Sequence, residues 1–178
     1  MRNVAVIIGS KSDLPQCLDG LQFLQEAFKA GGIELYLGSV LISSIHRATD
    51  DTLNQLGSMS AYGDVDVLIA GAGWANHLTG VCDAYLRYGL EDDKIVVIGV
   101  AFEDQKYQGH TVAAVSSIVN VPGTQVVYQD DQGIFIGANG FTRACRFAIE
   151  GELPEIRIPE PRPQEWLSLA EAIERASM

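Results

Sequence analysis

Short apolar runs rich in β-branched residues recur along the first hundred residues of the chain. Runs of this length, bounded by polar or glycine-containing segments, are typical of strands that are buried on both faces. The strands that this pattern predicts are residues 4–8, 33–41, 65–70 and 95–101. Strands of this kind occur in parallel sheets that helices cover on both sides, so we expect such a sheet here.

Helical patterns separate these runs. Apolar residues recur at helical spacing at positions 18, 21, 24, 27 and 28, which predicts a helix over residues 14–30. Ser12 or Asp13 can cap its start, and Gly31 and Gly32 provide a stop. Two further helices are predicted over residues 49–59 and 77–88. The alternation of strands and helices predicts a three-layer α/β domain with a central parallel sheet.

The second half of the chain is less regular. We expect a helix over residues 112–121 that ends before Pro122. Residues 125–129 and 133–136 read as two strands joined at 130–132, a hairpin signal. Asn139 is then expected to cap a helix from Gly140 to about residue 149.

The composition changes after residue 153. Four of the six prolines, at positions 154, 159, 161 and 163, predict an extended segment, and a short amphipathic helix carrying Trp166 follows. We therefore divide the chain into a single α/β domain over residues 1–153 and a Pro-rich arm with a C-terminal helix over residues 154–178. The arm either folds back on its own domain or contacts a neighbouring subunit, and we favour the oligomer contact.

Charge and composition exclude several classes of binding partner. The chain has 178 residues, which suits one domain, and its net charge is −11 without a cluster of Lys and Arg. Nucleic acid and anionic membranes are therefore poor partners. No apolar run is long enough to be a signal peptide core or a membrane span. Cys17, Cys82 and Cys145 are expected to be free thiols in a reducing cytoplasm, and neither they nor the three histidines have the spacing of a metal site.

Chemically active residues follow the first predicted strand. In a parallel α/β sheet, ligands bind at the carboxyl ends of the strands. Ser10 and Ser12 bring hydroxyls to the start of a helix, where backbone N–H groups can hold an anion, and Asp13 could accept hydrogen bonds from sugar hydroxyls. An ordinary capped helix start would also use these residue types, so both interpretations stay open.

Two more loops bring candidate binding residues to the carboxyl ends of the predicted strands. After the second strand, Ser44 and Arg47 can clamp a phosphate, and His46 can transfer a proton near neutral pH. After the third strand, Gly71 and Gly73 let a ligand approach the backbone closely. This glycine-rich loop matches a dinucleotide-binding pattern only in part, because Asn76 stands at its sixth position, so we do not expect a dinucleotide.

Together the three loops resemble those of the N5-carboxyaminoimidazole ribonucleotide mutase and phosphoribosylaminoimidazole carboxylase family. That family carries GSKSD after its first strand, SAHR after its second and AGAGGAAHLPG after its third. Here residues 9–13 match fully, residues 44–47 differ at one position, and residues 70–80 differ at Trp74, Asn76 and Thr79. The resemblance covers residues 4–101 well and continues weakly to residue 137.

The resemblance implies a flavodoxin-like fold, a cytoplasmic enzyme of purine biosynthesis, and a role for each matching residue. His46 would be the general acid/base, with His77 nearby, and Asp13 would bind the ribose. The other residues would hold the phosphate (Ser10, Ser12, Ser44, Arg47) or enclose CO2 (Gly71, Ala72, Gly73, Ala75, Asn76). The reaction would convert N5-carboxyaminoimidazole ribonucleotide into 4-carboxy-5-aminoimidazole ribonucleotide by loss and recapture of CO2, with no metal or organic cofactor. The family also implies a homo-octamer.

Several features depart from the family. Trp74 replaces a glycine in the wall of the CO2 site, residues 102–110 do not match, and residues 125–133 form a longer, Asp-rich segment. Arg47 and His77 favour the mutase branch, whereas Asn76 echoes the branch that carboxylates aminoimidazole ribonucleotide directly. Three alternatives to the mutase stay open: the direct carboxylase, a paralogue acting on another mononucleotide, and a catalytically silent nucleotide-binding module.

Overall fold

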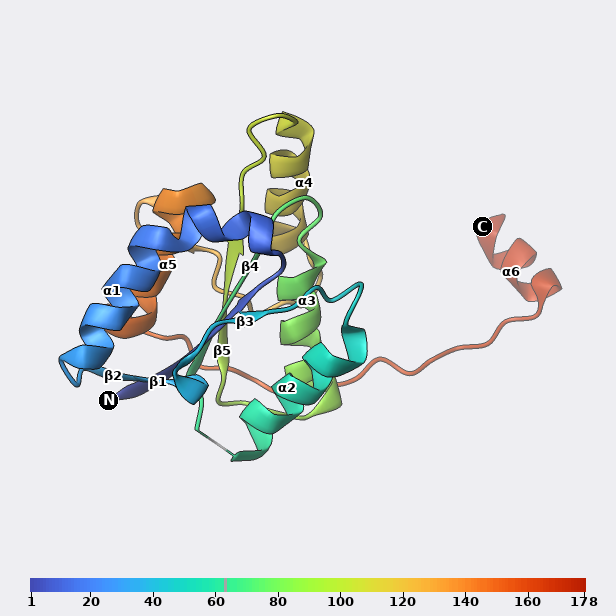
Figure 1. Cartoon of the computed structure of the whole chain (residues 1–178). Coiled ribbons are helices and arrows are strands. Elements are labelled where there is room, and N and C mark those ends of the chain that lie inside the picture. Colours follow the sequence, from blue (N-terminus) through green and yellow to red (C-terminus); the bar gives the residue numbers. More distant parts are fainter. Residues whose placement is uncertain (63) are drawn as a thin grey trace.

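A central parallel sheet organises the chain in the computed structural model, which describes residues 1–62 and 64–178 (Figure 1). The sheet strands are β1 (Arg2–Ile8), β2 (Ile33–Leu35), β3 (Leu41–Ile42), β4 (Val67–Ala72) and β5 (Val96–Ala101). Their order is β2–β1–β4–β5, and β3 pairs with the end of β1 beyond β2. Every pairing is parallel, as the buried apolar runs predict.

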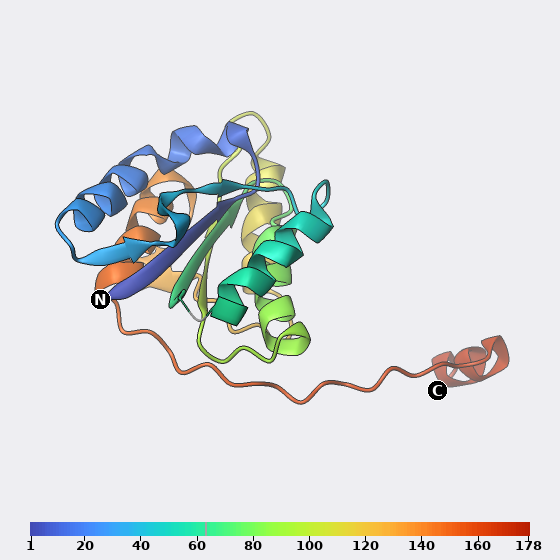
Figure 2. The same cartoon turned by 60° about the horizontal axis from the view of Figure 1, so that its bottom comes forward.

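Helices cover both faces of the sheet. The α-helices are α1 (Leu18–Lys29), α2 (Thr49–Tyr62), α3 (His77–Ala84), α4 (Gln108–Val119), α5 (Gly137–Glu150) and α6 (Leu169–Ala176). Shorter helical turns are η1 (Lys11–Cys17), η2 (Tyr36–Gly38) and η3 (Tyr85–Gly89), the last being a π-helical continuation of α3. Figures 1 and 2 show α1 and α5 on one side of the sheet and α2 and α3 on the other.

The alternation of side chains along β1 explains the three layers. Val4, Val6 and Ile8 join the core beneath α1 and α5, whereas Ala5 and Ile7 join the core beneath α2 and α3. All five residues are buried because successive side chains of a strand point to opposite faces, and both faces are covered. This confirms the predicted α/β domain with a central parallel sheet.

The prediction of one strand over residues 33–41 is wrong. Val4 pairs with Leu35 and Ile7 with Leu41, so the second segment uses more residues than β1 to cover the same distance. The surplus forms η2, where Leu37 and Gly38 have positive φ angles of 52° and 58°. A continuous apolar pattern does not reveal this excess, because register depends on the neighbouring strand.

Other boundaries also shift. The predicted first helix is divided into η1, which contains Pro15, and α1. Helix α4 begins at Gln108 and α5 at Gly137, both earlier than predicted, and Ile136 rather than Asn139 occupies the N-cap of α5. Helix α3 with η3 agrees with the predicted helix to within a residue.

The predicted hairpin is shorter than expected. Its strands are β6 (Gln129–Asp130) and β7 (Gly133–Ile134), which pair antiparallel around Asp131 and Gln132. The flanking residues instead form parallel bridges to β5, Val127 with Ile98 and Ile136 with Ala101. The segment that departs from the family therefore extends the edge of the main sheet.

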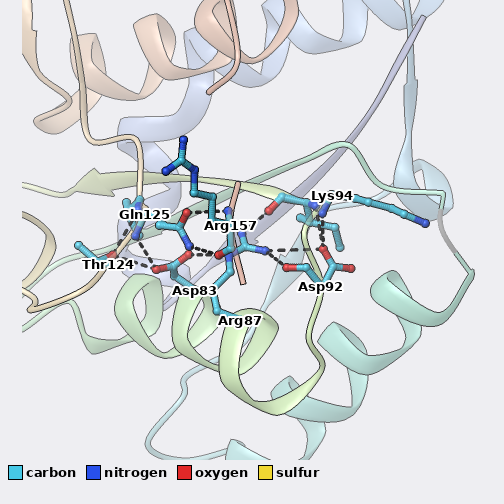
Figure 3. Close-up of polar contacts among 9 residues, drawn as sticks. Asp83, Arg87, Asp92, Lys94, Thr124, Gln125 and Arg157 are labelled. Atoms are coloured by element: carbon cyan, nitrogen blue, oxygen red, sulfur yellow. Dashed lines mark hydrogen bonds and ion pairs between the residues drawn. The ribbon is translucent and has the colours of Figure 1, made fainter. Parts of the chain in front are cut away.

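A buried ion-pair network is centred on Arg87 in η3 (Figure 3). Arg87 is 1% exposed, and its Nε atom lies 3.2 Å from the Oδ1 atom of Asp83. Its other nitrogens donate to the carbonyls of Asp92 and Ile95. The second oxygen of Asp83 accepts from Thr124 and from the backbone of Gln125. The network thus joins α3 and η3 to the segment before β5 and to the segment after α4, and each buried charge in it has partners.

The C-terminal arm leaves the domain at the same place. The side chain of Gln125 donates to the carbonyl of Arg157 at 2.6 Å and accepts from its backbone N–H at 2.9 Å. Ile156 is buried, whereas α6 carries exposed Leu169 and Ile173 and stands away from the domain (Figure 2). A capping box between Ser168 and Glu171 stabilises the start of this helix.

No helix within the described residues combines the length and the apolar character that crossing a membrane requires. All three cysteines are buried free thiols, as predicted. Burial raises the pKa of Cys17 and of Cys82 to about 12 in each case, which keeps both protonated and unreactive at neutral pH.

Candidate functional site

The carboxyl ends of β1, β3 and β4 lead into loops that line one cavity of about 430 Å³. That volume lies within the range of small-ligand sites. The cavity contains the expected residues of the first loop (Ser10, Ser12, Asp13), the second (Ser44, His46, Arg47) and the third (Ala72, Gly73, Ala75, His77). Residues from Gly9 to Leu78, distant in sequence, meet here because parallel strands end at the same edge of the sheet.

Gly9 allows the first and third loops to lie close to each other. Its N–H donates to the carbonyl of Gly71 at 2.9 Å, and a Cβ atom at position 9 would lie only 2.8 Å from the Cβ of Ala72. A larger residue would therefore push the two loops apart. This contact sets the width of the cavity at its base.

The first loop forms a hydroxyl-rich turn. Ser10 caps η1, since its Oγ atom accepts from the backbone N–H of Ser12 at 3.3 Å and from the Ser12 hydroxyl at 2.9 Å. Burial raises the pKa of the neighbouring Asp13 carboxyl, and hydrogen bonds from the Gly73 backbone and the Ser12 side chain partly offset this. Asp13 is thus a partly buried acceptor that faces the third loop.

A tight turn presents the second loop. The N–H groups of Arg47 and Ala48 both donate to the carbonyl of Ser44, at 3.0 and 2.8 Å. The buried Ser43 side chain shares a 2.6 Å hydrogen bond with Thr52 in α2. This anchoring leaves His46 and Arg47 exposed to the cavity at the start of α2.

His46 and His77 form a direct contact. The Nε2 atom of His46 lies 2.9 Å from the Nδ1 atom of His77, and the rings meet edge to face. One ring nitrogen must donate and the other must accept, so the tautomers of the two imidazoles are coupled. The pair can exchange a proton with a ligand in the cavity, because each imidazole ring can both donate and accept a proton through its nitrogens.

Two predicted residues lie outside the lining of the cavity, as far as the described residues show. Gly71 lies within β4, and a Cβ atom at this position would lie only 2.7 Å from the ring of Phe102. Asn76 is fully buried and caps α3: its amide donates to the carbonyl of Val100 at 2.9 Å, and its oxygen accepts from the N–H and the hydroxyl of Thr79. The side chain of Asn76 therefore holds the third loop in place rather than facing a ligand.

A fourth loop, after β5, contacts residues beside the cavity. The backbone of Glu103 exchanges two 3.0 Å hydrogen bonds with the side chain of Gln16 in η1. In the same segment, His110 stacks on Trp74, whose ring lines the cavity, with ring centroids 4.1 Å apart. Residues 102–110 match no family motif, although the position of this loop after the next strand of the sheet is a signal that could have identified it.

The part of the chain that the structure describes contains no cluster of metal ligands. Among residues 1–62 and 64–178, no group of three or more His, Cys, Asp or Glu side chains could hold a metal ion. The polar groups that converge on the cavity are hydroxyls, one guanidinium, one carboxylate and two imidazoles. This donor set suits a phosphorylated, hydroxylated ligand that undergoes proton transfer.

Comparisons with known proteins agree with this picture. The family model described as AIR carboxylase matches residues 3–137. An N5-carboxyaminoimidazole ribonucleotide mutase of Pyrococcus abyssi is 30% identical over 161 residues, which are 90% of this chain and 78% of the relative. The mutase of Thermotoga maritima is 32% identical over 123 residues, 69% of this chain, and the match spans 62% of the relative's length.

A solved structure shares the fold. PurE of Treponema denticola superposes with a TM-score of 0.54 over 84% of this chain and 88% of that protein, at 15% sequence identity. At this identity the likeness concerns the fold alone. The family match, in contrast, spans most of the chain and includes all three loops that line the cavity. This chain belongs to the AIR carboxylase family.

Proposed function

We propose that this protein is an N5-carboxyaminoimidazole ribonucleotide mutase that acts in purine biosynthesis in the cytoplasm. The observation that carries the proposal is the 2.9 Å contact between His46 and His77 in a cavity that also holds Arg47 and the serine hydroxyls. The names of the relatives support the substrate class.

The proposed binding mode follows from the donors of the cavity. The 5′-phosphate lies against the hydroxyls of Ser10, Ser12 and Ser44 and the guanidinium of Arg47, which can form two charge-assisted hydrogen bonds. The carboxylate of Asp13 accepts from the ribose hydroxyls. A carboxylate beside a phosphate would be repelled, so Asp13 is assigned to the sugar rather than to the phosphate.

The proposed chemistry needs two proton transfers. In the first step the bond between the exocyclic nitrogen and the carboxylate carbon breaks, the nitrogen takes a proton from His46, and CO2 is released. In the second step the ring carbon attacks CO2, and the surplus proton at that carbon returns to His46. The histidine thus ends in its starting state, as catalysis requires.

In this proposal the third loop holds CO2 in the cavity between the two steps. CO2 must stay beside the ring between the two steps, and the backbone and small side chains of Ala72, Gly73 and Ala75 offer a narrow space for it. Holding the two reactants together replaces a bimolecular encounter by an intramolecular step. His77 supports the proton shuttle through its contact with His46.

A direct assay tests the proposal. Purified protein is supplied with N5-carboxyaminoimidazole ribonucleotide, and formation of the carbon-carboxylated isomer is followed, with His46→Asn as the matched variant. We expect turnover by the wild type and almost none by the variant. Absence of turnover, or equal rates for both proteins, would refute the assignment. Turnover of aminoimidazole ribonucleotide plus CO2 in preference would identify the direct carboxylase instead.

We also propose that residues 154–178 form an oligomer contact, in an assembly for which the family implies an octamer. Helix α6 has an apolar side formed by Leu169 and Ile173, which are 79% and 59% exposed, and Trp166 beside it is 92% exposed. Such a surface is stabilised when it is covered. The Gln125–Arg157 contact directs the arm away from its own domain, which favours a neighbouring subunit as the partner.

A further inference from the structure

Trp74 occupies a backbone conformation that costs a bulky residue free energy. Its φ angle is +57°, in the left-handed region that glycine adopts without strain. Strain of this kind persists where the surroundings hold it in place, and it clusters at ligand sites. The backbone at position 74 thus carries strain that a glycine would avoid.

The ring of Trp74 is held from one side. His110, in the first turn of α4, stacks on it with a centroid separation of 4.1 Å and an interplanar angle of 25°. The ring of Tyr107 packs against the same histidine, with ring centroids 5.3 Å apart. The indole nevertheless stays 64% exposed and lines the cavity. Its surface beyond His110 is thus available to a ligand.

Asp104 orients the histidine. Its Oδ2 atom lies 2.7 Å from Nδ1 of His110, and its Oδ1 atom accepts from the N–H groups of Lys106 and Tyr107. The hydrogen bond from His110 lowers the pKa of Asp104, and the backbone donors add to this effect, so the carboxylate is charged at neutral pH. The imidazole plane is consequently fixed beneath the indole.

The loop that carries these residues is itself anchored. Glu103 is clamped to Gln16 of η1, and the N–H of Phe102 donates to the carbonyl of Ala72 at 3.0 Å. Asp104 donates its own N–H to the hydroxyl of Thr111 in α4. The series Asp104–His110–Trp74 is therefore a continuous set of contacts from the frame of the domain to the wall of the cavity.

We propose that Trp74 is a specificity-determining residue that recognises the planar heterocycle of the ligand, and that His110 and Asp104 are positioning residues that hold its indole ring at the cavity. The inference rests on the proposed function in one respect, the identity of the heterocycle, which we expect to be an imidazole attached to ribose phosphate. Aromatic rings attract planar heterocycles by offset or edge-to-face stacking. The sugar and the phosphate would be bound separately, by Asp13 and Arg47.

Two ligands that differ only in the ring test this inference. Affinities of 5-aminoimidazole ribonucleotide and of ribose 5-phosphate are measured by calorimetry on the full chain, without CO2 and therefore without turnover. For Trp74→Gly we expect the ribonucleotide to bind about tenfold more weakly, the order expected for a lost stack, and ribose 5-phosphate to bind unchanged. Trp74→Phe retains an aromatic ring and is expected to stay within about threefold of the wild type.

The positioning residues have their own variants. His110→Ala and Asp104→Asn are expected to weaken ribonucleotide binding by about threefold while ribose 5-phosphate is unaffected, because the indole is less well held. His110→Phe keeps a stacking ring without the Asp104 contact and is expected to restore most of the loss. In turnover assays these variants should raise KM more than they lower kcat, as loss of a ground-state contact does.

The outcomes separate this inference from the proposed function. Equal weakening of both ligands in Trp74→Gly would indicate a structural role and overturn it, as would wild-type protein that binds the ribonucleotide no better than ribose 5-phosphate. A Trp74-dependent preference for the ribonucleotide in a protein that does not isomerise N5-carboxyaminoimidazole ribonucleotide would support ring recognition while refuting the mutase assignment.

Discussion

The Nε2 atom of His46 and the Nδ1 atom of His77 are 2.9 Å apart, although the residues are separated by 31 positions in sequence. His46 belongs to the loop after β3 and His77 begins α3 after β4. Both β3 and β4 pair with β1, so the parallel sheet places the ends of these strands on either side of the end of β1. The sheet thereby builds a coupled imidazole pair from two loops.

The first prediction concerns this pair. His46→Asn is expected to lower kcat by about 10²–10⁴, the contribution of a general acid/base. His77→Asn should lower it less, by about tenfold to a hundredfold, because His77 acts through His46. The double variant should be no slower than His46→Asn, since coupled residues are not additive. Ligand affinity measured by calorimetry serves as the control, and an additive double variant would contradict the coupling.

The second prediction concerns the phosphate. Arg47→Ala is expected to weaken substrate binding by about 1.5–3 kcal/mol, the range for a hydrogen bond to a charged group. Arg47→Lys should recover only part of this, because an ammonium lacks the planar fork of guanidinium. Lys11→Ala is the matched control, since Lys11 is an exposed cation of the first loop outside the described lining of the cavity. Equal losses at positions 11 and 47 would point to general charge attraction instead.

The third prediction concerns Asp13 and pH. Burial raises the pKa of this carboxyl in the folded protein, so between the ordinary aspartate pKa of 3.8 and the raised pKa the folded state binds more protons than the unfolded state. Stability from this group therefore falls as pH rises through that window. Asp13→Asn should remove the penalty and stabilise the free protein at pH 7, by less than about 1 kcal/mol because the group is partly exposed.

Urea denaturation at pH 7 and pH 4 measures the Asp13 effect, and the gain of Asp13→Asn should shrink at the lower pH. The same variant should bind the ribonucleotide more weakly, because a charged acceptor for the ribose is lost. A variant that is less stable than the wild type at pH 7 would show that the charged form of Asp13 is favoured by folding, contrary to this prediction.

The fourth prediction concerns the buried network of Figure 3. Arg87→Met leaves Asp83 and Asp92 buried without their cation, and the expected loss is about 3–5 kcal/mol of unfolding free energy. Arg175→Met is the matched control, because the Arg175–Glu165 pair is more than half exposed on both sides and should contribute less than about 1 kcal/mol. Similar losses for both variants, by chemical denaturation, would contradict the assigned role of burial.

The fifth prediction concerns the arm. A chain ending at Ile158 retains buried Ile156 and the Gln125–Arg157 contact but lacks α6. We expect its circular dichroism spectrum to show a folded domain and light scattering to show a smaller assembly than for the full chain. An unchanged assembly, or a monomer both before and after truncation, would refute the proposed oligomer contact.

Local patterns in the sequence were sufficient to identify much of the fold. The apolar runs at residues 4–8, 65–70 and 95–101 correspond to β1, β4 and β5, because strands buried on both faces need apolar side chains at every position. The rule that ligands bind at the carboxyl ends of parallel strands then singled out the three loops that line the cavity.

Other features depended on neighbours in space. Residues 33–41 form a nearly continuous apolar run, yet pairing with β1 divides them into β2, η2 and β3. Asn76 sits in a motif that resembles a binding loop, but its side chain finds the buried partners Val100 and Thr79 instead. A polar group buried by the fold must satisfy its hydrogen bonds there, and sequence spacing does not reveal which partners it will meet.

The sequence by itself determined the α/β class, the strand ends and the kinds of chemical groups that those ends carry, because all of these follow from local periodicity and residue type. Only the tertiary structure decided that His46 touches His77, that Trp74 stacks on His110, and that the loop after β5 is bound to Gln16 beside the site. These contacts join segments that are distant along the chain, and their geometry is set by sheet register and packing rather than by either segment alone.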